Sequence, residues 1–228
     1  MSEWWTYRLS DFLLFSPQTY YRLFELYNAA IWPAQIVALA GGVALLVLLR
    51  IPAAWSGRTT AAILAASWLW TAFSYLRRHY DSINWAAEYF LIAFVAEAAL
   101  LLALAVTRTQ TRPAAERGWR FRIGFGIAAF AILLQPWIGP LLPGHDWRQA
   151  EFFGLTPDST AAATLGVLLA SQQMRWTLLI LPLVWCLLGG ATLWVMHMPH
   201  AFMLPLIGAT VLIAAAFPAL RKGKHPVA

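Results

Sequence analysis

Long apolar runs, separated by short basic or proline-containing segments, dominate the chain. A bilayer core about 30 Å thick requires about 20 apolar residues in each helix that crosses it. Seven runs approach this length, and they cover residues 31–49, 60–76, 83–106, 123–138, 157–174, 176–196 and 201–220. The pattern predicts an all-α integral membrane protein with seven transmembrane helices.

The fifth run is the least apolar, because its continuous apolar core covers only residues 161–170. Its start, Thr156-Pro157-Asp158-Ser159, is typical of a helix N-terminus, with a hydroxyl cap, proline at the first position and an acid in the first turn. A helix over residues 157–174 would be about 27 Å long at about 1.5 Å per residue. A re-entrant half-helix is therefore the alternative to a full span.

The basic residues decide between these alternatives, because positive side chains favour the cytoplasmic side of a membrane. They gather in two places, the connection between the third and fourth runs (Arg108, Arg112, Arg117, Arg120, Arg122) and the tail (Arg221, Lys222, Lys224). If both lie inside, an even number of crossings separates them and the fifth run must span. The N-terminus is then outside and the C-terminus inside, although Arg77 and Arg78 fall on the outer side against the rule.

The first 30 residues contain no pattern typical of a signal peptide. Aromatic and polar residues alternate over residues 11–28, which predicts an interfacial amphipathic element that Pro17 divides into two short helices. The predicted organisation is an extracytoplasmic amphipathic segment at residues 1–30, a transmembrane domain at residues 31–220 and a basic cytoplasmic tail at residues 221–228.

Composition agrees with this class. Hydrophobic residues make up 61% of the chain and charged residues 11%, and the mean hydropathy is +0.62. These values exclude a soluble globular domain and a disordered chain. The formal charge of +6 follows from the predicted topology, so it indicates contact with anionic lipids at the cytoplasmic face and not nucleic-acid binding.

Glu97 falls near the middle of the third predicted span, where an ionisable group costs about 2.5–3.5 kcal/mol on insertion scales. One interpretation is a carboxylate that relays protons or coordinates a substrate. The other is a protonated glutamate hydrogen-bonded to a neighbouring helix, for which the hydroxyls and the amide of the spans are candidate partners. These are Ser67, Thr71, Gln135 and Thr192.

Polar side chains gather on the predicted outer side. With Glu97 deeper, they form a candidate pathway for a substrate or proton, which consists of His79, Asn84, Glu88, Thr156, Asp158 and Ser159. Imidazoles bind zinc and copper, so the outer histidines are also candidate metal ligands, namely His79, His145, His197 and His200. None of them has the spacing of a known metal motif, and the sequence identifies no cofactor.

The N-terminal block carries a resemblance to a family. Trp4-Trp5-Thr6-Tyr7, the run from Ser10 to Pro17 and the run from Tyr20 to Asn28 resemble a family of bacterial multi-pass membrane proteins of unknown function. Gly154-Leu155-Thr156-Pro157 is similar to another recurrent block of that family, and the chain differs from the pattern at Glu97 and Asp158. The resemblance implies a bacterial inner membrane and implies no activity.

The first functional hypothesis is therefore permeation of a small solute or an ion, with proton coupling as one form of it. The second is a non-catalytic accessory or assembly subunit of a membrane complex, and the third is a metal-binding or redox membrane protein that uses the outer histidines. No catalytic motif occurs in a fitting context, which favours a non-enzymatic role. The expected partner is the lipid bilayer, and the sequence leaves a homo-oligomer or a larger membrane complex open.

Overall fold

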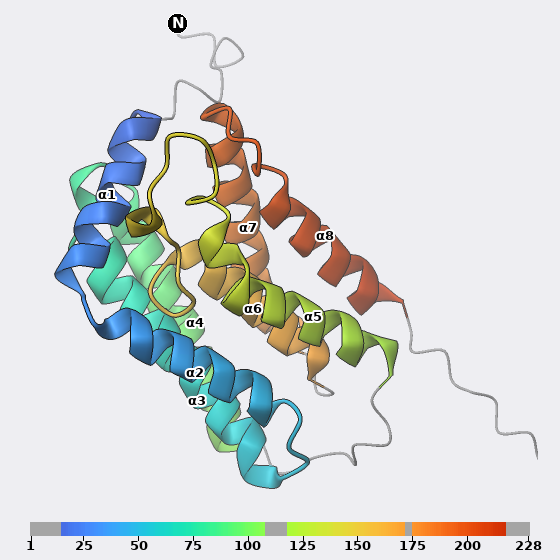
Figure 1. Ribbon diagram of the computed structural model, residues 1–228. Coiled ribbons are helices and arrows are strands. Elements are labelled where there is room, and N and C mark those ends of the chain that lie inside the picture. The colour runs from blue at the N-terminus through green and yellow to red at the C-terminus, as the bar shows by residue number, and fades with distance from the viewer. Residues whose placement is uncertain (1–14, 108–117, 172–174, 218–228) are drawn as a thin grey trace, which may run out of the picture.

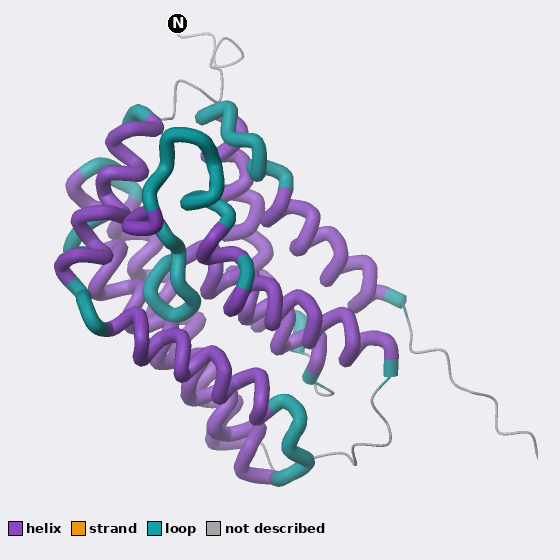
Figure 2. The backbone as a smooth tube through the Cα atoms, in the orientation of Figure 1, coloured by secondary structure: helices purple, strands orange, loops and turns teal. Residues whose placement is uncertain are grey.

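The protein is described by a computed structural model over residues 15–107, 118–171 and 175–217. Within these ranges the chain forms helices and loops and no strand, as Figure 2 shows. The α-helices are α1 (Pro17–Ala30), α2 (Ala34–Leu48), α3 (Ala54–Trp70), α4 (Ala87–Thr107), α5 (Trp119–Leu133), α6 (Pro157–Ala170), α7 (Thr177–Val195) and α8 (Met203–Ala216). The prediction of an all-α protein is confirmed.

Four short helical segments join these helices. They are the π-helical η3 (Thr71–Leu76), which continues α3, and the 3-10 segments η4 (Tyr80–Ser82), η6 (Gln135–Trp137) and η7 (Trp147–Gln149). A long loop from α5 to α6 contains the last two and lies beside α1 at one end of the bundle (Figure 1). The predicted tail at 221–228, residues 1–14 of the N-terminal element and Arg108, Arg112 and Arg117 lie outside the described residues.

Helix α1 begins where its sequence provides a cap. The Ser16 side chain accepts a hydrogen bond from the Thr19 backbone N–H, and Pro17 takes the first helical position, where its missing N–H costs nothing. Pro17 therefore starts one helix, while the part of the predicted element before residue 15 lies outside the described residues. Helix α1 then meets α2 at an angle of 92°.

Each of the seven predicted spans coincides with a helix, but their lengths differ. Helices α4 and α7 are long and apolar enough to cross a membrane, and the bent pair of α1 and α2 would pass as a third span if it counts as one. Helix α8 is apolar but shorter. Two or three helices of the structure therefore support a membrane protein, and seven crossings are not established.

Helix α6 lies at the centre of the bundle, and every residue from Pro157 to Ala170 is buried. It packs against α5, α7, α8 and α3. The closest approach is to α5, where Gly124 and Ala128 face Gly166 and Ala170 so tightly that backbone meets backbone. Residue pairs of this small-xxx-small type let helix backbones approach closely.

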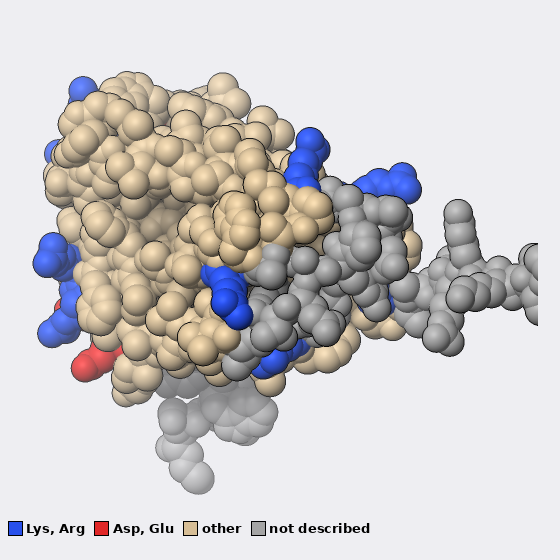
Figure 3. All heavy atoms as spheres, turned by 90° about the horizontal axis from the view of Figure 1, so that it is seen from below, with Lys and Arg blue, Asp and Glu red and all other residues tan. Residues whose placement is uncertain are grey.

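The two ends of the bundle differ in charge. Five described arginines lie in or next to the ends of α2, α3, α5 and α7 that point to the lower end of the bundle in Figure 1, and they are Arg50, Arg58, Arg120, Arg122 and Arg175. Figure 3, seen from this end, shows more basic than acidic side chains. Apart from Glu97 within α4, the described acidic residues belong to α1, η4, the start of α4, the loop from α5 to α6 and the start of α6. Arg22, Arg77, Arg78 and Arg148 lie in or beside the same segments. The sequence places the five arginines of the lower end on one side of the membrane.

Candidate functional site

A cavity of about 80 Å³ lies between α1 and the neighbouring parts of α4, α6 and α7. Its walls come from α1, η3, η4, α4, α6 and α7, which are far apart in sequence. The lining residues are Tyr20, Tyr75, Tyr80, Asn84, Phe90, Pro157, Asp158, Trp185, Leu188, Gly189 and Thr192. Asn84, Leu188 and Thr192 keep part of their surface exposed, so they mark the mouth of this tyrosine-lined cavity.

Asp158 is the one charged side chain among these lining residues, and it is 4% exposed. It occupies the first turn of α6, where the positive end of the helix dipole favours a carboxylate. The Trp185 indole N–H donates a hydrogen bond of 2.7 Å to Asp158 Oδ1. The other oxygen, Oδ2, accepts no hydrogen bond from the described residues, so half of the carboxylate is available to a ligand.

Gly189 of α7 makes room for this carboxylate. A Cβ at position 189 would lie 3.1 Å from Asp158 Oδ1 and 3.4 Å from Oδ2. The first distance is tighter than nine in ten real Cβ contacts. The absence of a side chain at Gly189 therefore allows α7 to pass beside Asp158 while Trp185, one turn earlier, donates to it.

Three tyrosines supply hydroxyls to the cavity. The Tyr80 hydroxyl accepts a hydrogen bond of 2.9 Å from Asn84 Nδ2, whereas the Tyr20 and Tyr75 hydroxyls have no hydrogen-bond partner among the described residues. Burial raises the pKa of Tyr80 to about 12, and burial together with the charges of Asp158 and Glu151 raises the pKa of Tyr20 further. These phenols therefore stay protonated at neutral pH and can donate.

A second carboxylate approaches the cavity from the long loop. Glu151 Oε2 is buried and has no hydrogen-bond partner within the described part of the chain. Burial and the negative charge of Asp158 both raise the pKa of Glu151 well above its usual value. The end of the bundle beneath α1 therefore holds two acidic groups in a poorly solvated position, and the described lining of the cavity includes no basic residue.

Glu97 lies deeper along α4, seven residues beyond Phe90, which corresponds to about 10 Å along the helix axis. Its side chain is 1% exposed, and its Oε1 has no hydrogen-bond partner in the ranges that the structure describes. The hydroxyls expected to satisfy it are engaged elsewhere, because Ser67 donates to Ile63 O, Thr71 to Ser67 O and Thr192 to Leu188 O. None of these three hydroxyls therefore donates the predicted hydrogen bond to Glu97.

An aromatic layer separates Glu97 from the cavity. Phe94 of α4 lies between Phe90 and Glu97 in sequence, and its ring centroid is 4.4 Å from that of Trp68 and 5.0 Å from that of Trp185. The Trp68 indole donates a hydrogen bond of 2.9 Å to Thr164 Oγ1 on α6. Both tryptophans are thus held by polar groups of α6, which fixes the layer between two acidic side chains.

The other predicted pathway residues lie around the cavity without lining it. Thr156 and Ser159 are buried, and their hydroxyls are 2.9 Å apart at the start of α6. Glu88 is exposed at the start of α4. His79 donates from Nδ1 to Ser74 O at 2.8 Å, and its ring packs on Tyr27. Of the predicted set, the structure brings Asn84 and Asp158 together.

The four outer histidines do not converge. His145 donates from Nδ1 to Gln149 Oε1 at 2.7 Å, while His197 is exposed and has a φ of 57°. Burial and proximity to His145 lower the pKa of His200, whose Nδ1 has no partner among the residues described. Within the described residues, no group of three or more His, Cys, Asp or Glu side chains is placed to hold a metal ion.

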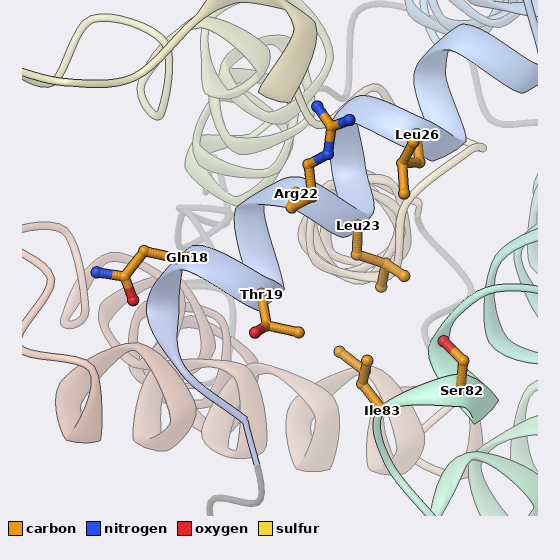
Figure 4. Close-up of a pocket in the computed structure, with 7 residues that line it drawn as sticks. All are labelled: Gln18, Thr19, Arg22, Leu23, Leu26, Ser82 and Ile83. Carbon is orange, nitrogen blue, oxygen red and sulfur yellow. The ribbon is translucent and has the colours of Figure 1, made fainter.

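A larger groove of about 410 Å³ lies on the surface between α1 and the segment around η4. In Figure 4, Thr19, Leu23 and Ile83 point toward one another across it, while Gln18 points away. Arg22 at its edge pairs with Glu25. The described lining contains no carboxylate or histidine, so this groove lacks the chemistry of the tyrosine-lined cavity.

Comparison with known proteins identifies the family. The sequence profile of a family of unknown function, DUF6064, matches residues 17–224. The chain belongs to the DUF6064 family. No curated protein and no solved structure matches it. The matched range includes every residue that lines the cavity, so the site is built within the DUF6064 domain itself.

Sequence reasoning misses the aromatic members of this DUF6064 site. The pattern assigns Tyr20 to an interfacial amphipathic element, and Trp185 falls inside the predicted span 176–196 without a role. Tyr75 and Tyr80 lie in η3 and η4, and nothing in their local sequence indicates that the hydroxyls share a space with Asp158. The one usable signal is the tyrosine content of residues 20–27 and 75–80 beside polar segments assigned to the same outer side.

Proposed function

We propose that this DUF6064 protein is a multi-pass membrane protein that lets a small solute or ion pass, with proton movement as part of the process. The pathway enters through the tyrosine-lined cavity and continues past Phe94 to Glu97. One observation carries the proposal. Asp158 and Glu97 are both buried at successive depths of the same bundle, and each has a carboxyl oxygen without a hydrogen-bond partner among the described residues.

Buried carboxyl groups within membrane helices are expensive, and they commonly mark ion or proton pathways. Oxygens that already satisfied one another would instead indicate a purely structural role. The unpartnered oxygens of Glu97 and Glu151 therefore favour exchange with a transient ligand, such as water, a proton or a cation. Phe94, between the two levels, acts in this proposal as the barrier that has to move.

The proposed topology has seven crossings, the N-terminus outside and the C-terminus inside a bacterial inner membrane. Two features support it. The arginines at one end of the bundle fit the cytoplasmic side, and the cavity opens at the other end. The short α6 is compatible with a crossing, because its neighbours and not lipid surround it.

Flux through proteoliposomes tests the proposal. A pH-sensitive dye trapped in the vesicles reports proton movement under a potassium diffusion potential, and uptake of labelled methylammonium reports cation movement. We expect flux above that of empty vesicles, and at least a tenfold loss in Glu97→Gln and Asp158→Asn. The matched control is Asp81→Asn, which alters an exposed carboxylate next to Tyr80 that pairs with Arg77.

The proposal fails if the purified protein conducts no more than empty vesicles. It also fails if Glu97→Gln leaves the flux unchanged. A further variant, Phe94→Ala, should raise the leak of protons without a solute gradient, because it removes the aromatic side chain between the two acidic levels. Unchanged leak in that variant would remove Phe94 from the pathway.

A further inference from the structure

The chemistry of the cavity also indicates which ligands it takes. Its described lining contains one carboxylate, Asp158, and no basic residue, and Glu151 adds a second acidic group nearby. An anion would be repelled by the Asp158 carboxylate, and a neutral donor could pair with Asp158 Oδ2 but would leave its negative charge uncompensated. The electrostatics of the site therefore select a cation.

The walls discriminate between kinds of cation. Five aromatic residues surround the space, namely Tyr20, Tyr75, Tyr80, Phe90 and Trp185. Aromatic faces attract cations, and cages of such rings are suited to alkylated ammonium groups. Several of these rings also pack on one another, since Phe90 meets Trp185 edge-on at 5.2 Å and Tyr75 stacks on Tyr80 at 5.8 Å. The cage is therefore preformed.

The oxygen supply is low for a bare metal ion. Hard cations such as Ca²⁺ and Mg²⁺ take about six or more oxygen ligands. Among the described lining residues, the side-chain oxygens that carry no hydrogen bond are Asp158 Oδ2 and the Tyr20 and Tyr75 hydroxyls. Asp158 Oδ1, the Tyr80 hydroxyl, Asn84 Oδ1 and Thr192 Oγ1 each already take part in one. An ammonium group with methyl substituents requires fewer oxygens and gains from contact with the rings.

Size sets the upper limit. A single water needs about 10–15 Å³ of cavity volume, so the 80 Å³ of this cavity accommodates roughly five to eight groups of that size. A nitrogen with four methyl groups has five such groups and falls within this range. Longer amines would have to extend through the mouth at Asn84, Leu188 and Thr192.

We infer that the tyrosine-lined cavity binds a small alkylated ammonium cation, with the charge on Asp158 Oδ2 and the methyl groups against the aromatic rings. The inference rests on the proposed function only for the passage of the cation after it has bound. Binding itself is measured without a membrane gradient, so failure of transport and failure of recognition give different results.

Calorimetric titration of the full chain in an uncharged maltoside detergent tests the inference. The probes are tetramethylammonium chloride, potassium chloride at equal ionic strength and tert-butanol as a neutral molecule of similar size. We expect saturable binding of tetramethylammonium alone, at least a tenfold loss of affinity in Asp158→Asn and wild-type affinity in the matched control Asp81→Asn. Equal or tighter binding of potassium would show an inorganic-ion site and overturn the inference, as would absence of saturable binding.

A second pair of variants keeps the test decisive if Asp158→Asn fails to fold. Tyr20→Phe retains the ring and removes the hydroxyl, whereas Tyr20→Leu removes the ring. The aromatic cage requires Tyr20→Leu to lose about fivefold in affinity or more, with a smaller change in Tyr20→Phe. Equal affinity in these two variants would overturn the role of the rings.

Discussion

The contact between α5 and α6 makes a quantitative prediction for Gly124→Ala. A Cβ at position 124 would lie 2.4 Å from the Ala170 backbone nitrogen and 2.5 Å from the Gly166 carbonyl oxygen. Ordinary van der Waals contact begins at 3.4 Å. Both obstacles are backbone atoms of a helix that is buried on all sides, so no side chain can rotate away. The two helices must instead separate by about 1 Å.

Forcing extra volume into a packed interior costs about 1–3 kcal/mol. Replacing glycine by alanine within a helix gains up to about 1 kcal/mol from helix propensity, and this gain has to be subtracted. Gly126→Ala supplies the matched control, because it makes the same change two residues away in α5 and meets nothing within 4 Å. The difference between the two variants therefore isolates the steric conflict.

Thermal unfolding in detergent, followed by intrinsic tryptophan fluorescence, measures this difference. With about 2 kcal/mol between the variants and about 2–4 °C per kcal/mol for a chain of this size, Gly124→Ala should unfold roughly 4–8 °C below Gly126→Ala. Gly126→Ala should match the wild type or exceed it. If both variants unfold within about 1 °C of each other, the close packing of α5 on α6 is wrong.

Three further substitutions test the tyrosine-lined cavity and the loop from α5 to α6 beside α1. Glu151→Gln should raise the free energy of unfolding at pH 7 and have no effect below about pH 4. The folded-state pKa of Glu151 is raised, so its contribution to stability is present below the ordinary pKa of 4.5 and is lost as the pH rises. Equal stability of the variant and the wild type at pH 7 in denaturant titrations would contradict this. Asn28→Ala removes the side-chain donor to Arg148 O and Ala150 O and should lower the free energy of unfolding by about 1–3 kcal/mol. Proteolysis of the loop from α5 to α6 should become faster, and an unchanged cleavage rate would refute the role of Asn28 in holding that loop. Gly189→Ala should reduce the affinity for tetramethylammonium with little change in melting temperature, because its Cβ presses on Asp158, and calorimetric titration checks it.

Local patterns are sufficient to locate the helices. Most of the apolar runs end next to arginines, glycines or prolines, and each predicted run overlaps one helix of the structure because those residues commonly terminate apolar helices. The start of α6 at Pro157 and the close contact at Gly124 are likewise predictable, since a capping sequence and a pair of small residues act over a single helix turn. The number of membrane crossings is not, because it depends on helix lengths and tilts that composition does not encode.

The site depends on information that no local pattern carries. Tyr20 and Trp185 are separated by most of the chain, and only the bend between α1 and α2 brings α1 over the ends of α4, α6 and α7. Three of the four predicted partners of Glu97 are engaged elsewhere for a related reason. Ser67, Thr71 and Thr192 have carbonyls of their own helices within reach, and a hydroxyl in a helix commonly donates there before it donates to a distant carboxylate.

The complete enclosure of α6 has a consequence for how the protein is made. Because none of its residues faces outward, contacts with α3, α5, α7 and α8 stabilise its position in place of lipid contact. During synthesis α6 leaves the ribosome before α7 and α8 exist, so two of its four neighbours are missing when it first meets the bilayer. In the proposed topology, the segment that contains Asp158, Thr160 and Thr164 therefore has to be sheltered until α8 has been synthesised, and truncation before α8 would remove one of its four neighbouring helices.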